Sequence, residues 1–254
     1  MLKLLLMRHG ESISNRDRRM AGQDHASLTD SGHQQCQQLA AWLHKRNWHP
    51  THIYSSPLNR ALESVEELLL PWQWQLRPEK SPTPETEVGE DRGAAMLIPL
   101  FAKGPQAAPQ FLISHHLQEF QAGILTGLTW PEAQQRYPNL CRTLETSLDW
   151  VPIPAAETPH QGKQRAQALI EHLLAHHGNG DAVWVMAHQW ILEHLIAVLL
   201  GSDRTWQITM PNTALFEFWL DRDRWSQSGM ARHISDLWQI KRFNDCPHLN
   251  TANE

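Results

Sequence analysis

The chain has 254 residues and a net charge of −5 with histidine neutral, which argues against a large nucleic-acid-binding surface. Its hydrophobic content of 41% is sufficient for a folded core, and no apolar run reaches the roughly 18 residues that a membrane helix needs. The three cysteines, Cys36, Cys141 and Cys246, are odd in number and widely spaced. We therefore expect reduced thiols in a cytoplasmic protein with no signal peptide and no membrane association.

The first predicted element is a buried strand over residues 2–7, the apolar run LKLLLM. A helix with one apolar face follows, and Thr29 or Asp30 is placed to cap its first turn. The apolar positions of this helix recur at i, i+3, i+4 and i+7: Cys36, Leu39, Ala40 and Leu43.

A second strand is predicted over residues 52–56. Pro57 then opens a helix that runs to Leu70 and stops at Pro71, with Ser56 as the expected cap. Residues 71–110 differ from their surroundings, because proline, glycine and charged residues are scattered through them. We interpret this segment as an insertion.

The remaining predicted elements are a strand at 111–113, helices at 130–137 and 159–176, a strand at 182–187, a helix at 190–200, and strands at 213–220 and 236–243. Strands that alternate with helices predict an α/β fold, here a three-layer sandwich with a mainly parallel sheet and helices on both faces. We expect a single domain over residues 1–244 and a flexible tail over 245–254.

Cationic and imidazole side chains follow three of these strands. Arg8 and His9 end the first strand, Arg60 lies in the helix turn after the second, and His188 ends the strand at 182–187. The carboxyl ends of parallel strands lie on one edge of a sheet, so these residues converge there in the predicted fold. Two arginines, two histidines and nearby helix N-termini make a site for a dianion such as phosphate.

These segments resemble the histidine phosphatase superfamily, which also contains the cofactor-dependent phosphoglycerate mutases. The matching blocks are Leu6 to Ser12 with Asn15, Ala21-Gly22, Leu28 to Gly32, Ser55 to Ala61, Glu119 with Gly123 and Gly127, and Met186 to His188. The resemblance covers nearly the whole chain except 71–110 and the tail. It implies a phosphoglycerate mutase-like fold and the chemistry of phosphate esters.

By this resemblance His9 is the nucleophile and becomes a phosphohistidine, while Arg8, Arg60 and His188 hold the phosphate oxygens. Glu119 protonates the leaving oxygen and then activates water. Neighbouring arginines disfavour the imidazolium, so His9 stays neutral and nucleophilic at pH 7. This set supplies positioning and charge without a metal or cofactor.

Four further residues are expected to bind substrate. Asn15, Ala21 and the backbone of Gly22 match substrate-contacting positions of the family, and Gln189 follows the second histidine where the family commonly has glycine. The Gln189 side chain either narrows the pocket or binds substrate. Glu119 comes 59 positions after Arg60, a long gap that the insertion at 71–110 explains. Insertions at this point tend to lie over the active site in the family, so we hypothesise a lid.

Several functions remain open at this level. We expect a metal-independent phosphomonoesterase acting on a phosphorylated small molecule. The alternatives are a phosphoglycerate mutase, a weakly catalytic binder of phosphorylated ligands or partner proteins, and a protein phosphohistidine phosphatase. A mutase of this family has an Arg- and Tyr-rich segment after the catalytic glutamate, whereas residues 121–127 read QAGILTG. The natural substrate and the oligomeric state cannot be read from the sequence.

Two other clusters carry weaker interpretations. His172, His176 and His177 lie on one predicted helix, where two of them could chelate a metal, but no third ligand has a recognisable spacing. The basic residues Arg16, Arg18 and Arg19 follow the nucleophile loop. They form either a solvated loop or a surface that steers anionic substrates.

Overall fold

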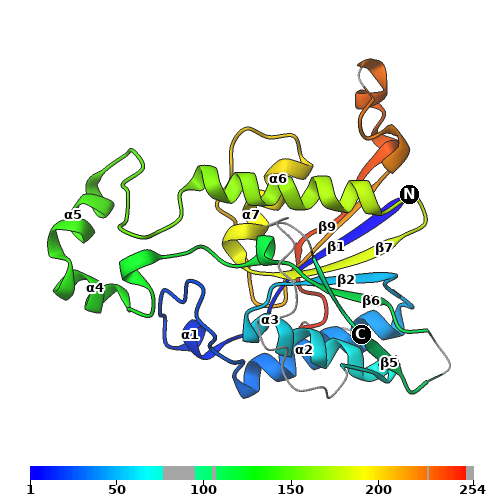
Figure 1. Ribbon diagram of the computed structural model, residues 1–254, viewed down its shortest axis with the longest axis horizontal. Coiled ribbons are helices and arrows are strands. Elements are labelled where there is room, and N and C mark those ends of the chain that lie inside the picture. Colours follow the sequence, from blue (N-terminus) through cyan, green and yellow to red (C-terminus); the bar gives the residue numbers. More distant parts are fainter. Residues whose placement is uncertain (77–94, 105–106, 228, 250–254) are drawn as a thin grey trace.

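The computed structural model describes residues 1–76, 95–104, 107–227 and 229–249 (Figure 1). Its main sheet has the strand order β4-β6-β2-β7-β1-β8-β9. These strands are β1 (Leu2–Arg8), β2 (His52–Ser55), β4 (Met96–Ile98), β6 (Gln110–Ile113), β7 (Ala182–Ala187), β8 (Leu215–Leu220) and β9 (Trp238–Asp245). The central strands β6, β2, β7 and β1 are parallel, β4 and β8 are antiparallel to them, and β9 returns to the common direction. The predicted mainly parallel sheet is confirmed.

Helices cover both faces of the sheet (Figure 1). The helices α2 (Asp30–Lys45) and α3 (Asn59–Leu69) lie on one face, and α6 (Pro159–His176) and α7 (Gln189–Leu199) on the other. Side chains of β1 alternate between the two cores, since Leu4 and Leu6 pack with α6 and α7, and Leu5 and Met7 pack with α2 and α3. The three-layer sandwich predicted from the alternating elements is therefore confirmed.

Shorter helices lie outside these layers. The turn-length α1 (Ile13–Arg16) follows β1, and α4 (Trp130–Arg136) and α5 (Pro138–Thr146) lie away from the sheet (Figure 1). Helices α4 and α5 form a small core of their own with the loop before α4. Within the described ranges, no helix is long and apolar enough to cross a membrane.

The proline-rich segment contributes short strands at one edge of the sandwich. Strand β3 (Trp74–Leu76) pairs with β5 (Leu100–Ala102) in a separate two-stranded sheet, while β4 extends the main sheet. The hypothesised lid falls mostly on residues 77–94, which lie outside the described residues, so it stays a prediction. The described parts of the segment do not line the cavity discussed below.

Two boundaries differ from the sequence predictions. Helix α3 begins at Asn59 rather than Pro57, and Ser56 is not its cap, because the Ser56 hydroxyl instead contacts His188. The predicted tail starts at Asp245, whereas Asp245 ends β9 and His248 is 2% exposed. Nε2 of His248 lies 2.8 Å from the hydroxyl of Thr213, which precedes β8.

Candidate active site

Backbone pairing brings the ends of β1, β2 and β7 together. Arg8 pairs with Ala187, and Ser55 pairs with Met186, so the residues that follow these strands meet at one edge. The His9 N–H donates to the Ala187 carbonyl at 3.1 Å, which extends the β1–β7 ladder by one residue. The convergence expected from parallel strand ends is therefore present.

His9 is held in one orientation by its own loop. The ring is 2% exposed, and its Nδ1–H donates to the Gly10 carbonyl at 2.6 Å, so the lone pair of the neutral ring is on Nε2. A Cβ on Gly10 would come within 2.6 Å of the Gly32 carbonyl and 2.8 Å of the Cys36 sulfur. Glycine is therefore required where this loop packs on α2.

Burial keeps the His9 imidazole neutral. Burial is the largest cause that holds the pKa of His9 well below its usual value, and Arg60 and Arg8 lower it further. The sequence predicted that the arginines keep His9 neutral, and in the structure burial lowers the pKa of His9 more than they do.

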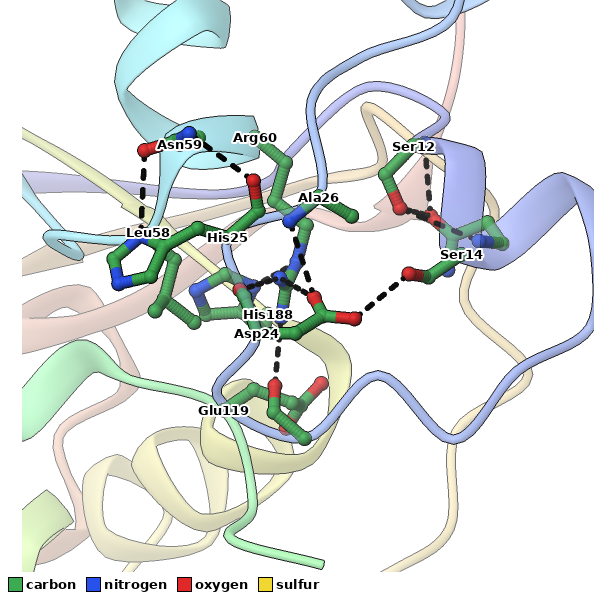
Figure 2. Close-up of polar contacts among 12 residues, drawn as sticks. Ser12, Ser14, Asp24, His25, Ala26, Leu58, Asn59, Arg60, Glu119 and His188 are labelled. Atoms are coloured by element: carbon green, nitrogen blue, oxygen red, sulfur yellow. Dashed lines mark hydrogen bonds and ion pairs between the residues drawn. The ribbon is translucent and has the colours of Figure 1, made fainter. Parts of the chain in front are cut away.

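Arg60 lies at the centre of the hydrogen-bond network in Figure 2 and is 1% exposed. Its Nε–H donates to Nδ1 of His188 at 3.2 Å, and its Nη2 donates to the Gly22 carbonyl at 2.9 Å. Its Nη1 donates to the Asp24 carbonyl at 2.8 Å and to the Asp24 carboxylate at 3.1 Å. One of the five guanidinium N–H groups, the second on Nη2, is left for a ligand.

His188 accepts a hydrogen bond from Arg60 and is fully buried. Because Nδ1 accepts from Arg60, the neutral ring carries its proton on Nε2, which donates to the Ser56 hydroxyl at 2.8 Å. Burial lowers the pKa of His188 well below its usual value, and Arg60 lowers it further. The His9 and His188 rings lie 4.9 Å apart, yet both nitrogens of His188 have protein partners.

Asp24 is a site residue that the sequence predictions missed. Its carboxylate accepts from Arg60 and, through the other oxygen, from the Ser14 hydroxyl at 2.9 Å (Figure 2). The only available signal was its place between the Ala21-Gly22 pair and the Leu28 block. Asp24 thus joins the Arg60 guanidinium to Ser14 in α1.

Arg8 supplies the second cation. Its Nη1 donates to the Met210 carbonyl, and its Nε is buried with no hydrogen-bond partner among the described residues. Burial lowers the pKa of Arg8, but an arginine remains charged at neutral pH. Arg8 therefore presents a desolvated and incompletely paired positive charge to the site.

Glu119 lies close to both arginines despite its distance in sequence. One carboxylate oxygen accepts the Phe120 N–H at 2.8 Å, and the Gln23 side chain donates to the Glu119 carbonyl at 3.1 Å. Burial raises the pKa of the Glu119 carboxyl, and the Phe120 N–H, Arg60 and Arg8 oppose this rise. A raised carboxyl pKa suits a group that must donate a proton.

Asn15 and Gln189 have different surroundings. The Asn15 carbonyl oxygen accepts from the Ser12 N–H and from Asn212, each at 3.2 Å, which leaves its amide nitrogen for a ligand. The Gln189 amide donates to the Ile208 carbonyl at 2.9 Å and to Glu193 at 3.3 Å. Asn212, which also donates to the His9 carbonyl at 3.1 Å, is a second residue that the sequence predictions missed.

A single cavity of about 670 Å³ joins these groups. Eight of the nine residues predicted from sequence line it: Arg8, His9, Asn15, Ala21, Gly22, Arg60, Glu119 and Gln189. The ninth, His188, lies behind Arg60. Within the ranges that the structure describes, no group of three or more His, Cys, Asp or Glu side chains is arranged to hold a metal. His177 of the histidine cluster instead has its Nε2 2.9 Å from the Tyr54 hydroxyl.

The family model of the histidine phosphatase superfamily (branch 1) matches residues 4–83 and 102–232. The chain belongs to the histidine phosphatase superfamily. This membership confirms the resemblance that the sequence blocks indicated.

Relatives in the superfamily include mutase-like proteins and phosphatases. Phosphoglycerate mutase-like protein 4 of Arabidopsis thaliana is 24% identical over 226 residues, which are 88% of this chain and 82% of the relative. Several other curated relatives are matched over only 30–36% of their own length.

Two solved histidine phosphatase-like structures share the fold. YhfR of Bacillus stearothermophilus has a TM-score of 0.69 at 21% identity, covering 98% of this chain and 100% of that one. A phosphoserine phosphatase from Entamoeba histolytica has a TM-score of 0.64 at 20% identity, covering 98% and 100%.

Proposed function

We propose that the protein is a metal-independent phosphomonoesterase that works through a phosphohistidine on His9. The observation that carries this proposal is the bond from His9 Nδ1 to the Gly10 carbonyl. This bond leaves Nε2 as the nucleophilic nitrogen in a cavity that Arg8, Arg60 and Glu119 also line. Two guanidinium groups and a proton donor are what phosphoryl transfer from an ester requires.

In the first step the Nε2 lone pair attacks phosphorus, and a P–N bond forms as the ester P–O bond breaks. The electron pair of that bond goes to the leaving oxygen, which takes a proton from the Glu119 carboxyl. Arg8 and the free N–H of Arg60 neutralise the charge on the remaining oxygens. The alcohol then leaves.

In the second step a water molecule attacks the phosphohistidine. Glu119, now a carboxylate, accepts a proton from the water as the new P–O bond forms. The P–N bond breaks, and its electron pair returns to Nε2. Nδ1 keeps its proton throughout, because the Nδ1–H donates a hydrogen bond to the Gly10 carbonyl. The products are inorganic phosphate and the regenerated enzyme.

His188 acts in this proposal as a positioning residue. The sequence predicted that it holds a phosphate oxygen directly, but both ring nitrogens are occupied by Arg60 and Ser56. We infer that it sets the orientation of the Arg60 guanidinium. Asp24 holds the opposite side of the same guanidinium.

The test is turnover of p-nitrophenyl phosphate in the presence of EDTA, with wild type compared with His9→Ala. We expect wild type to keep its activity on chelation and His9→Ala to lose nearly all of it. Loss of wild-type activity in EDTA contradicts the metal-free mechanism, and full activity of His9→Ala removes the nucleophile assignment.

The same preparations test two of the three alternatives, the mutase and the weakly catalytic binder. Conversion of 3- to 2-phosphoglycerate by a bisphosphate-primed enzyme at a rate above ester hydrolysis identifies a mutase. Tight binding of phosphate esters with no turnover identifies a weakly catalytic binder.

A further inference from the structure

The cavity continues past the reacting groups along an apolar wall. This wall is formed by Met20, Phe120, Ala122, Leu125, Ile153, Pro159 and Trp190. The rings of Phe120 and Trp190 lie 5.0 Å apart at an interplanar angle of 49°. An aromatic or aliphatic group that follows the ester oxygen would be desolvated here.

The aromatic part of this wall is held rigidly. Helix α6 has Gly162 where it meets the Trp190 ring, and a Cβ there would lie 2.1 Å from the ring's edge. Next to Gly162, the His194 ring packs against the edge of Trp190 with ring centroids 4.3 Å apart. Trp190 is therefore a fixed surface that needs no reordering when a ligand binds.

The arginines among the described residues of the cavity either face the phosphate end or pair with other protein groups. Among the described lining residues the arginines are Arg8, Arg19 and Arg60. Arg8 and Arg60 face the phosphate end, whereas Arg19 donates to the Glu132 carboxylate at 2.8 Å and to the Gly127 carbonyl at 2.8 Å. Burial lowers the pKa of His194 to about 4, so it is neutral at pH 7. A second anionic group on a substrate would find no unpaired cation among these residues.

Glu193 places a carboxyl group in the same cavity. Burial raises the pKa of this carboxyl, and the Ile208 N–H, the Gln189 amide and Arg8 oppose the rise. Its side chain lines the cavity, and the residue is 8% exposed. One oxygen accepts the Ile208 N–H at 2.9 Å and the Gln189 amide at 3.3 Å. No cation forms a salt bridge with it in the described part of the chain. A substrate carboxylate beside Glu193 would meet another carboxyl group, and the positive charge that acts on Glu193 is that of Arg8 at the phosphate end.

We propose, on the basis of the phosphatase function above, that the site selects phosphate monoesters whose alcohol is apolar and carries no further anionic group. The apolar wall with Phe120 and Trp190 binds the alcohol. Glu193 and the pairing of Arg19 with Glu132 discriminate against carboxylates and second phosphates.

The test compares two esters of equal shape, 4-carbamoylphenyl phosphate and 4-carboxyphenyl phosphate. We expect kcat/KM to favour the neutral carbamoyl ester by at least about tenfold at pH 7. Equal values, or a preference for the carboxylate, overturn the proposal. Calorimetric binding of the two matching arylphosphonates measures the same preference without turnover. If no ester is hydrolysed, the proposed function fails, and the phosphonate affinities still decide the selectivity.

Two variants assign the selectivity to residues. Glu193→Gln should lower the ratio of kcat/KM for the carbamoyl ester over the carboxyl ester severalfold. Glu171→Gln, at an exposed position of α6, is the control and should leave this ratio unchanged. Ile153→Ser should lower the ratio of kcat/KM for 1-naphthyl phosphate over methyl phosphate by about tenfold. An unchanged ratio in Glu193→Gln removes Glu193 from the proposal. Equal losses on both esters in Ile153→Ser remove the apolar wall.

Discussion

The Nε–H of Arg60 donates to Nδ1 of His188 across 3.2 Å, between the first turn of α3 and the end of β7. A guanidinium has no acceptor atom, so this contact fixes the unprotonated nitrogen of His188 and hence its tautomer. Together with the bonds from Arg60 to Asp24 and Gly22, this contact leaves a single guanidinium N–H for a ligand. In the proposed mechanism, the residues that hold Arg60 in place therefore control how well phosphate is bound.

Asp24 is the first of these residues to test. Asp24→Asn removes the carboxylate that pairs with Arg60 at 3.1 Å, and we expect kcat/KM for p-nitrophenyl phosphate to fall about tenfold. The affinity for inorganic phosphate should weaken in parallel, because the effect passes through Arg60. Asp17→Asn, which removes an exposed partner of Arg16, is the control and should change neither value. Unchanged kinetics in Asp24→Asn would show that Arg60 needs no such anchor.

The raised pKa of Glu119 predicts an alkaline limit to activity. In the proposed mechanism the acid form donates the proton in the first step, so kcat/KM should fall as the pH rises through the raised pKa of this carboxyl. The pKa of His9 lies well below its usual value, so its neutral form is present across the same range. Glu119→Gln should lower kcat by about 10²- to 10⁴-fold and flatten the alkaline limb. A pH–rate profile of wild type and variant measures both effects, and an unchanged alkaline limb in Glu119→Gln would assign it to another group.

Buried neutral histidines predict a loss of stability in mild acid. Burial lowers the pKa of His248 to about 4, so the unfolded chain binds the proton more readily than the folded one as the pH falls through the usual histidine range. The free energy of unfolding should fall between pH 7 and pH 5, by up to about 2 kcal/mol for this group. His248→Asn should reduce this pH dependence, whereas His160→Asn at an exposed position should not. Urea denaturation at pH 7 and pH 5 measures the free energy of unfolding. An equal change in this free energy between the two pH values in wild type, His248→Asn and His160→Asn would refute the prediction.

The close approach of Gly10 to Gly32 predicts that position 10 requires glycine. Gly10→Ala places a Cβ against the Gly32 carbonyl and the Cys36 sulfur and should lower the free energy of unfolding by about 1–3 kcal/mol. It should also lower kcat, because the Gly10 carbonyl orients His9. At Gly178 an added Cβ meets no atom within 4 Å, so Gly178→Ala is the matched control and should be nearly neutral. Wild-type stability and rate in Gly10→Ala would mean that the loop adjusts freely.

Strong local signals made some elements predictable. The bounds of α6 and β7 match the predicted 159–176 and 182–187, because Thr158 caps a helix with Pro159 at its start, and a run of apolar residues forms the buried strand. Helix α5 was missed, since Tyr137 provides no side-chain cap and Cys141 is its only buried residue. The β3–β5 pair was missed because three-residue strands give too little alternation.

The residues of the candidate site were predictable where they follow a strand, and not where they lie in loops. His9, Arg60 and His188 were found because each follows a strand, and parallel strand ends converge by topology alone. Asp24 and Asn212 were not found, because they lie in loops and act through other residues. Their partners depend on where the loops fold back, which no local pattern encodes.

The most direct test of the account is the chemical identity of the intermediate. The enzyme is mixed with a ³²P-labelled aryl phosphate, quenched in alkali within one turnover, and digested for peptide analysis. We predict an alkali-stable, acid-labile phosphoramidate on His9, absent in His9→Ala. Turnover without any protein-bound label, or label on a residue other than His9, would contradict the account.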